Sequence, residues 1–248
     1  MAEFKFPTEM VELPSKGHFY MDGHPLSEGK VEIKYMTAKE EDILTSQNLI
    51  KQGTVIDKLM QSLIVDKSIN IDDMLVGDKN AIMVAARVLG YGKDYEFKYD
   101  GEVQTTDLSK LEPKKLDLSK YPKGINKFSF TLPNSKRKIT FKLLTGKDEK
   151  EIELEIKARQ KISKEFSSEL TTRLKHMILS VDDKSDKAYI NNFVDNEFLS
   201  VDSLKFRSFM SSITPDVDMT AKVVDSAGKE TEGTIPVTLR FFWPEPWV

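Results

Sequence analysis

The sequence has no cysteine among its 248 residues. This absence excludes disulfide bonds, cysteine-ligated zinc or iron–sulfur clusters, and thiol nucleophiles. It is also typical of a reducing compartment. The sequence has no apolar run of about 18 residues, so it predicts no membrane-spanning helix. Its first ten residues, MAEFKFPTEM, lack the apolar core of a signal peptide. We therefore expect a soluble cytoplasmic chain.

Histidine is scarce, with three residues. His18 and His24 flank Asp22 and could hold a metal ion, but two histidines and one aspartate in a loop are a weak signal. An exposed polar loop is the favoured interpretation, and His176 falls within a helical pattern where packing or solvent exposure explains it. The sequence also lacks a Gly-rich phosphate loop and a Gly-x-Ser-x-Gly elbow. We predict no catalytic, cofactor-binding or metal-binding residue, and no enzyme.

A strong charge of one sign is also missing, because the formal net charge is −3. Lys136-Arg137-Lys138 is a short basic run, but it lies among abundant acidic residues. We expect no nucleic acid partner. A nucleic-acid-binding adaptor remains the alternative from another class of function, and it would lose binding when these three side chains are removed.

The sequence does contain one phrase twice. VEIKYMTAKEEDIL spans residues 31–44 and ITFKLLTGKDEKEI spans residues 139–152. Each begins with apolar residues at alternate positions, which is typical of a strand with one buried face. Each then places a Thr three residues before an acid, Thr37 before Glu40 and Thr145 before Asp148. This spacing predicts a capping box at the start of a helix.

The similarity continues on both sides of the phrase. Leu13-Pro14-Ser15-Lys16 corresponds to residues 132–136, and Leu75-x-x-Asp78 corresponds to Leu199-x-x-Asp202. Periodic apolar stripes predict helices at about 55–64, 78–89 and 201–213, with a shorter one at 188–194. They also predict a helical stretch at about 148–179, as one helix or as two separated by a break. Alternation at 95–99 and at 217–223, each followed by a turn, predicts two β-hairpins.

These patterns predict an α+β fold of two tandem related modules. Each module has a few antiparallel strands, about three helices and a terminal β-hairpin that resembles a zinc-ribbon frame without its cysteines. We place the first module at 1–112, with an extended N-terminal hairpin whose tip is Gly17 to Gly29. The linker is 113–124, and the second module is 125–248 and ends in an aromatic tail.

Two aromatic stretches are candidate partner-binding segments, because aromatic residues are favoured anchors of protein interfaces. Burial in the protein's own core is the competing interpretation for the tail. The residues are His18, Phe19, Tyr20, Met21, Phe241, Phe242, Trp243 and Trp247.

The strings ELPSKGHFY and GKVEIKYMTAKEEDILTS, and FFWP near the end, resemble the T4-type bacteriophage baseplate hub assembly family. The resemblance is clearest over Val11 to Leu89. It implies a protein that binds other baseplate hub or tail proteins in the host cytoplasm during tail assembly, as an assembly factor without catalysis. A permanent subunit of the virion baseplate hub is the alternative within the family. The hydrophobic fraction of 39% favours the transient role, and self-association is compatible with the duplication.

Overall fold

A computed structural model describes residues 7–162, 168–226, 228–237 and 241–242. The described residues form eight α-helices and nine strands, joined by short 3₁₀ turns and one π-helical turn at Phe193–Glu197. The helices are α1 Ala38–Thr45, α2 Gln47–Gln52, α3 Val55–Leu63, α4 Val76–Tyr91, α5 Gly146–Ile162, α6 Glu169–Met177, α7 Lys187–Asn192 and α8 Ser200–Ile213. The strands are β1 Thr8–Glu12, β2 Lys30–Lys34, β3 Asp94–Tyr99, β4 Glu102–Asp107, β5 Phe128–Thr131, β6 Lys138–Phe141, β7 Ile178–Val181, β8 Thr220–Val224 and β9 Glu230–Thr234.

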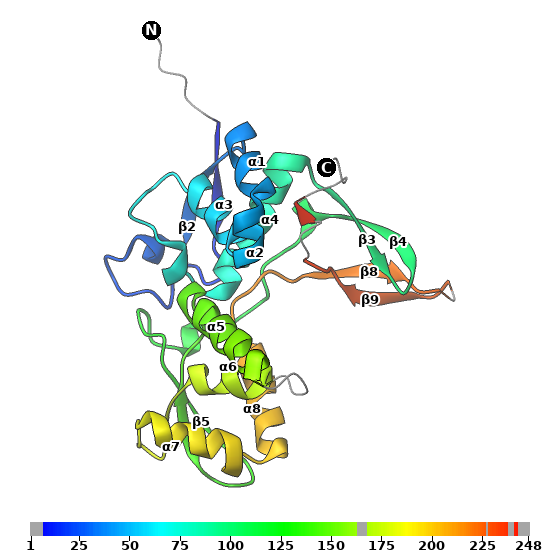
Figure 1. Ribbon diagram of the computed structural model, residues 1–248. Helices are drawn as coiled ribbons and strands as arrows, with labels where there is room; N and C mark the ends of the chain where they lie inside the picture. Colours follow the sequence, from blue (N-terminus) through cyan, green and yellow to red (C-terminus); the bar gives the residue numbers. More distant parts are fainter. Residues whose placement is uncertain (1–6, 163–167, 227, 238–240, 243–248) are drawn as a thin grey trace.

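The elements are arranged as two helical bodies and one projecting arm (Figure 1). Helices α1–α4 pack beside the β1–β2 pair in the first body, and α5–α8 pack beside the antiparallel β5–β6–β7 sheet in the second. The hairpins β3–β4 and β8–β9 lie next to each other and form the arm. This confirms the predicted α+β class with small antiparallel sheets. No helix of the described ranges combines the length and apolar character needed to cross a membrane.

Some helices and strands begin or end at other residues than the sequence predicted. The helical stretch predicted at 148–179 is wrong at its end, because Ile178–Val181 forms β7 and pairs with β6. The strand predicted to start at Val217 starts at Thr220, since Val217 instead bridges Pro113. The helix predicted at 201–213 is confirmed within one residue by α8.

The segment Gly17 to Gly29, predicted as an extended hairpin tip, lies between the paired strands β1 and β2 and is partly buried. Leu26 is fully buried, and Phe19, which is 4% exposed, packs on the ring of Phe128 of β5. Gly17 and Gly29 both have positive φ, and a Cβ at Gly17 would lie 2.3 Å from the carbonyl oxygen of Ser27. Two glycines therefore allow a tight crossing of the loop, and Phe19 and Leu26 turn inward while Met21 remains exposed.

A buried carboxylate fixes this loop to the first helical body. Asp78, in the first turn of α4, accepts hydrogen bonds from the backbone N–H of Ser15 at 2.9 Å and from its hydroxyl at 2.7 Å. The Tyr20 hydroxyl also donates to Asp78, at 2.6 Å, and accepts from the N–H of Leu75 at 2.8 Å. Helix α4, the chain after β1 and the loop before β2 thus meet at one side chain.

The second body contains the corresponding arrangement. Asp202, in the first turn of α8, accepts hydrogen bonds from the backbone N–H groups of Asn134 at 2.8 Å and Ser135 at 2.9 Å. Both turns also contain a lysine with positive φ, Lys16 at 50° and Lys136 at 59°. Residues that matched in the sequence therefore make matching contacts in the structure.

The two bodies meet where α4 and α5 begin. The N–H of Val76 donates to the carbonyl of Leu144 at 3.1 Å, and the N–H of Gly146 donates to Met74 at 2.8 Å. A Cβ at Gly77 would lie 1.9 Å from the carbonyl oxygen of Pro215. Only glycine allows the first turn of α4 to lie against this chain.

The segment 113–124, predicted as a linker, packs against the rest of the protein. The N–H of Lys114 donates to the carbonyl of Asp216 at 2.8 Å, and the N–H of Gly124 donates to the backbone carbonyl of His18 at 2.7 Å. The Tyr121 ring lies 5.3 Å from that of Phe128. These contacts hold the segment along both bodies.

We expect Tyr20→Phe to lower the free energy of unfolding by about 1–3 kcal/mol, because it removes a hydrogen bond to Asp78 and leaves the Leu75 N–H without its acceptor. Tyr35→Phe is the matched control, since the Tyr35 hydroxyl has no hydrogen bond to any residue in the described ranges. Urea denaturation of both variants measures the difference. Equal stability losses would contradict a special role for Tyr20.

Candidate interaction surfaces

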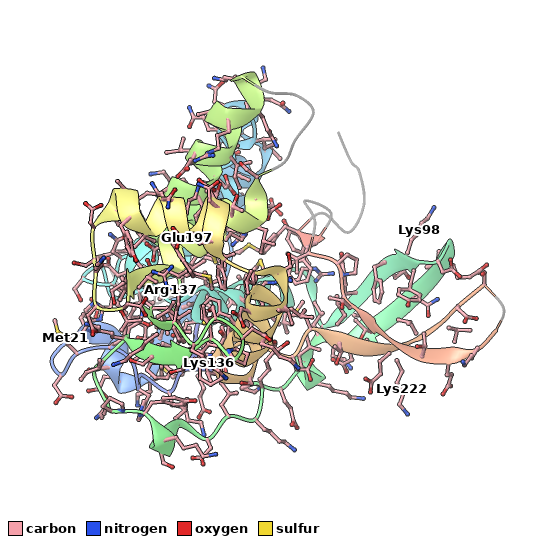
Figure 2. The ribbon with its side chains drawn as sticks, turned by 90° about the horizontal axis from the view of Figure 1, so that it is seen from below. Met21, Lys98, Lys136, Arg137, Glu197 and Lys222 are labelled. Atoms are coloured by element: carbon pink, nitrogen blue, oxygen red, sulfur yellow. The ribbon has the colours of Figure 1, made fainter. Side chains whose placement is uncertain are left out.

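The predicted contact segment 18–21 is divided between core and surface. Phe19 and Tyr20 are 4% and 7% exposed, so their side chains belong to the core and are not displayed to a partner. The Phe19 ring lies 5.3 Å from Phe128. His18 is half-buried and its Nε2 lies 2.8 Å from the carbonyl oxygen of Tyr121. Met21 is 72% exposed and projects from this loop (Figure 2).

Core packing is also the outcome for the described part of the aromatic tail. Phe241 and Phe242 are fully buried, so they are not surface anchors. The ring of Phe241 lies 5.0 Å from Tyr95 of β3, whose hydroxyl donates to the carbonyl of Pro236 at 3.0 Å. Phe241 therefore packs at the base of the arm. Trp243 and Trp247 lie outside the described residues.

The arm is held together by side chains rather than by a continuous sheet. The Gln104 amide donates to the carbonyl of Val224 at 3.0 Å and accepts from its N–H at 3.0 Å. Asp100, in the turn of β3–β4, accepts from the N–H and the hydroxyl of Ser226 at 3.1 and 2.6 Å. Tyr99 packs on Gly233, where a Cβ would approach the ring to 2.8 Å. The arm is therefore built jointly by residues distant in the sequence.

A buried arginine lies where the arm leaves the first body. Arg87 of α4 is 2% exposed, and its guanidinium donates to the carbonyls of Gly92 at 2.6 Å and Asp94 at 3.1 Å. It also lies over the rings of Tyr91 and Tyr95, at 5.7 and 5.8 Å from their centroids. Burial lowers the pKa of this guanidinium. Arg87 thereby fixes the direction in which β3 departs from α4.

The basic run 136–138 is largely engaged within the second body. Arg137 forms ion pairs with Asp182 and Glu197, and its guanidinium lies 4.7 Å from the centroid of the Phe193 ring (Figure 2). The N–H of Lys138 donates to Asp182 at 2.8 Å. These contacts explain the central arginine by internal structure, which weakens the case for a nucleic acid surface here.

Paired lysines and acids explain the repeated phrase. Lys34 donates to Glu40 at 2.7 Å in the first body, and Lys142 donates to Asp148 at 2.6 Å in the second. The N–H groups of Thr37 and Thr145 donate to the same two carboxylates, each at 3.0 Å. The capping box predicted at Thr37 and Glu40 is confirmed, and the strand before each helix is tied to the helix start.

The Glu40 carboxyl is strongly stabilised as an anion. Its burial raises the pKa, but hydrogen bonds from Lys34, Ser62 and Thr37 outweigh burial and hold the pKa at about 2. At Asp202 burial also raises the pKa, and the bonds from Asn134 and Ser135 again lower it to about 2. Asp78 behaves oppositely, because there burial dominates and raises the pKa.

Among the described residues, Asp148, Glu151 and His176 are close enough to share a metal ion. Asp148 already accepts from Lys142 and Thr145. The Nε2 atom of His176 lies 3.1 Å from a carboxylate oxygen of Glu155. These partners account for the grouping without a ligand. His18 and His24, considered for a metal in the sequence, instead contact Tyr121 and the N–H of Leu26.

Comparison with known proteins finds no matching family model, no matching curated protein and no matching solved structure.

We expect Gln104→Ala to separate the two hairpins of the arm locally. Losing two hydrogen bonds at a partly exposed site costs about 0.5–1.5 kcal/mol of global stability, and amide exchange at Val224 should accelerate severalfold. Hydrogen–deuterium exchange of peptides covering 220–224 measures this effect. Thr105→Ala, at a neighbouring exposed residue, is the control and should leave the exchange unchanged. Equal exchange in both variants would show that the Gln104 side chain does not hold the hairpins together.

We expect Glu40 to stabilise the fold in a pH-dependent way. Its folded pKa lies below the ordinary value of 4.5, so its contribution is complete above about pH 4.5 and is lost as the pH falls towards 2. Glu40→Gln should cost about 1–2 kcal/mol near pH 7, after allowance for solvent screening, and clearly less near pH 3. Urea denaturation at both pH values tests this, with exposed Glu41→Gln as control. A cost independent of pH would refute it.

Proposed function

We propose that the chain is a bacteriophage tail baseplate hub assembly factor, a chaperone-like protein that binds hub subunits during tail assembly and has no catalytic activity. The main support is the structural position of the residues that resemble the family. Ser15 and Tyr20, which belong to the string ELPSKGHFY, donate hydrogen bonds to the buried Asp78. Lys34 and Glu40, which belong to the string GKVEIKYMTAKEEDILTS, join β2 to α1 through their ion pair. Likeness at such fold-determining positions is a stronger indication of a shared fold than likeness at the surface.

The same proposal includes two tandem related modules, at 1–112 and 125–248, joined by 113–124. The supporting observations are contacts in the first half that have a counterpart in the second. Asp78 and Asp202 each bind the turn that follows the first strand of their half, and Lys34–Glu40 has its counterpart in Lys142–Asp148. Each half ends in a hairpin. The proposal also includes a zinc-ribbon-like frame for these hairpins, in which hydrogen bonds and packing replace cysteine-bound metal.

A binding role suits this architecture because the arm and the loop at Met21 extend from opposite sides of the compact part (Figure 2). Both are largely polar, with a few exposed apolar residues: Met21 at 72% in the loop, and Val103 at 63% and Val224 at 39% in the arm. Surfaces of this composition favour reversible association over the large apolar interfaces of permanent complexes. We therefore favour a transient assembly factor over a permanent hub subunit.

Co-expression with the baseplate hub and tape-measure proteins of the encoding phage tests the proposal. We expect affinity capture of at least one hub protein and absence of the chain from mass spectra of purified virions. Capture together with stoichiometric presence in virions would instead assign a permanent subunit. Failure to capture any hub or tail protein would refute the assignment.

A matched pair of variants locates the contact. Met21→Asp should reduce capture, because it places a charge at the exposed apolar end of the loop. Leu154→Asp, at a comparably exposed residue of α5 (68%), should leave capture unchanged. Equal capture by both variants would exclude Met21 as an anchor.

A further inference from the structure

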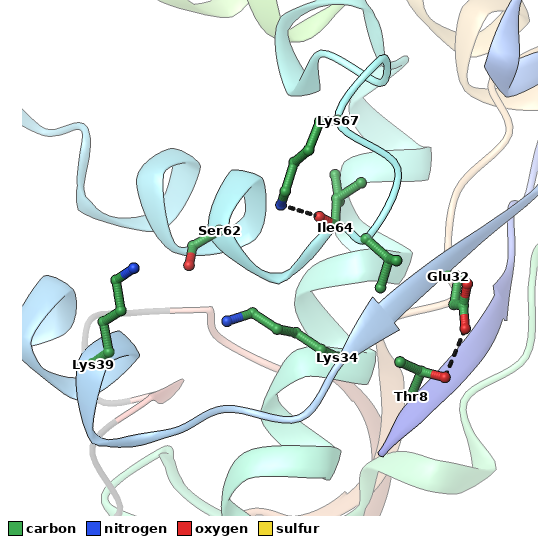
Figure 3. A pocket seen from close by; sticks show the side chains of 8 residues that line it. Thr8, Glu32, Lys34, Lys39, Ser62, Ile64 and Lys67 are labelled. Atoms are coloured by element: carbon green, nitrogen blue, oxygen red, sulfur yellow. Dashed lines mark hydrogen bonds between the residues drawn. The ribbon is translucent and has the colours of Figure 1, made fainter. Parts of the chain in front are cut away.

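An open groove lies on the first body between β1–β2 and the helices α1 and α3 (Figure 3). Its volume is about 840 Å³, which is enough space for several amino-acid side chains. Strands β1 and β2, the start of α1, and the end of α3 with the chain that follows it all contribute to the groove. Its shape is therefore fixed by the fold of the body. The lining residues are Thr8, Glu32, Lys34, Lys39, Ser62, Ile64, Val65 and Lys67.

Three ammonium groups point into one end of this groove. Figure 3 shows the Nζ atoms of Lys34, Lys39 and Lys67 directed towards the space beside Ser62. Lys34 of β2 and Lys39 of α1 are close in the sequence, and the fold brings Lys67, from the chain after α3, to the same place. Glu32 lies at the other end, where its carboxylate accepts from the Thr8 hydroxyl at 2.6 Å.

The three lysines are not equally engaged by the protein. Lys34 pairs with the buried Glu40, which balances its charge and fixes its position. Lys67 donates to the carbonyl of Ile64, a neutral group that leaves its charge unbalanced. Lys39 is exposed and has no hydrogen bond or ion pair with any residue of the described ranges. Lys39 and Lys67 therefore supply uncompensated positive charge at this end.

The floor of the groove is apolar next to this charge. Ile64 is fully buried beneath it and Val65 is 41% exposed within it. A ligand that fits both features carries an anionic group and an aliphatic group a few ångströms apart. Adjacent acidic and aliphatic side chains of a peptide meet this requirement.

We propose that this groove binds an acidic segment of a partner protein. A Glu or Asp side chain would lie between Lys39 and Lys67, and a neighbouring aliphatic side chain would cover Val65. A nucleic acid fits less well, because the lining contains no aromatic ring for base stacking and contains the Glu32 carboxylate. The inference rests on the groove alone and does not require the partner to be a phage protein.

Fluorescence anisotropy with a short fluorescein-labelled peptide of alternating Glu and Leu tests the proposal on the full chain. We expect saturable binding that weakens as salt is added, since exposed charge pairs are screened. A Gln–Leu peptide of the same length should bind at least about tenfold more weakly, because it lacks the carboxylates. Equal binding of the two peptides would overturn the charge argument.

Lys39→Glu combined with Lys67→Glu should weaken binding of the Glu–Leu peptide by about tenfold or more. The control is Lys98→Glu combined with Lys222→Glu, which changes the net charge equally on exposed positions of the arm (Figure 2). The control should alter affinity less than about twofold, which separates the groove from a general effect of protein charge. Equal losses in both double variants would overturn the proposal.

Labelled single-stranded DNA provides the remaining comparison. DNA that binds more tightly than the peptide and loses affinity in the Lys39/Lys67 variant would assign the groove to nucleic acid and overturn the acidic-peptide proposal. Circular dichroism and urea denaturation of each variant establish that it is folded. Because neither peptide nor DNA is a hub protein, failure here leaves the capture experiment with hub proteins as a separate test of the assembly role.

Discussion

The structure of each half depends on one buried aspartate in the first turn of a helix. A carboxylate suits this position, because the unpaired N–H groups and the dipole of the helix start favour negative charge. The same carboxylate accepts donors from a distant turn, Ser15 for Asp78 and Asn134 with Ser135 for Asp202. A single side chain in the first turn of a helix thus holds a distant turn of the chain.

The two aspartates lie at similar positions in their helices but in different surroundings. Asp202 receives two backbone N–H groups and the Asn134 amide, and its pKa falls to about 2. Asp78 has a tyrosine hydroxyl as one of its donors and lies under the folded loop 17–29, so burial dominates and its pKa rises. The first half therefore gains the anchoring of an added loop while the anionic form of its carboxylate becomes less favourable.

Local features of the fold could be predicted from the sequence, and long-range ones could not. The capping box at Thr37 and the helix at 201–213 follow from spacing alone, and the structure confirms them. Burial of Phe19 and Phe241 depends on which surfaces meet in space, and an aromatic stretch looks the same in a core or at an interface. The joining of the hairpins by Gln104, and the meeting of Lys39 and Lys67, carry no periodic signal because the contributing segments are far apart in the chain.

The groove lies where the first body differs from the second in its strand pairing. In the second half, the chain after α6 continues along β6 as β7 for four residues. In the first half, the chain after α3 bridges β2 only at Ile64, with one further bond from Val65 to Glu32, and then turns away. That departure leaves the side of β2 open and brings Lys67 towards Lys34 and Lys39. The extent to which the chain pairs with the sheet therefore decides whether its side is covered, as at β6, or open beside lysine side chains, as at β2.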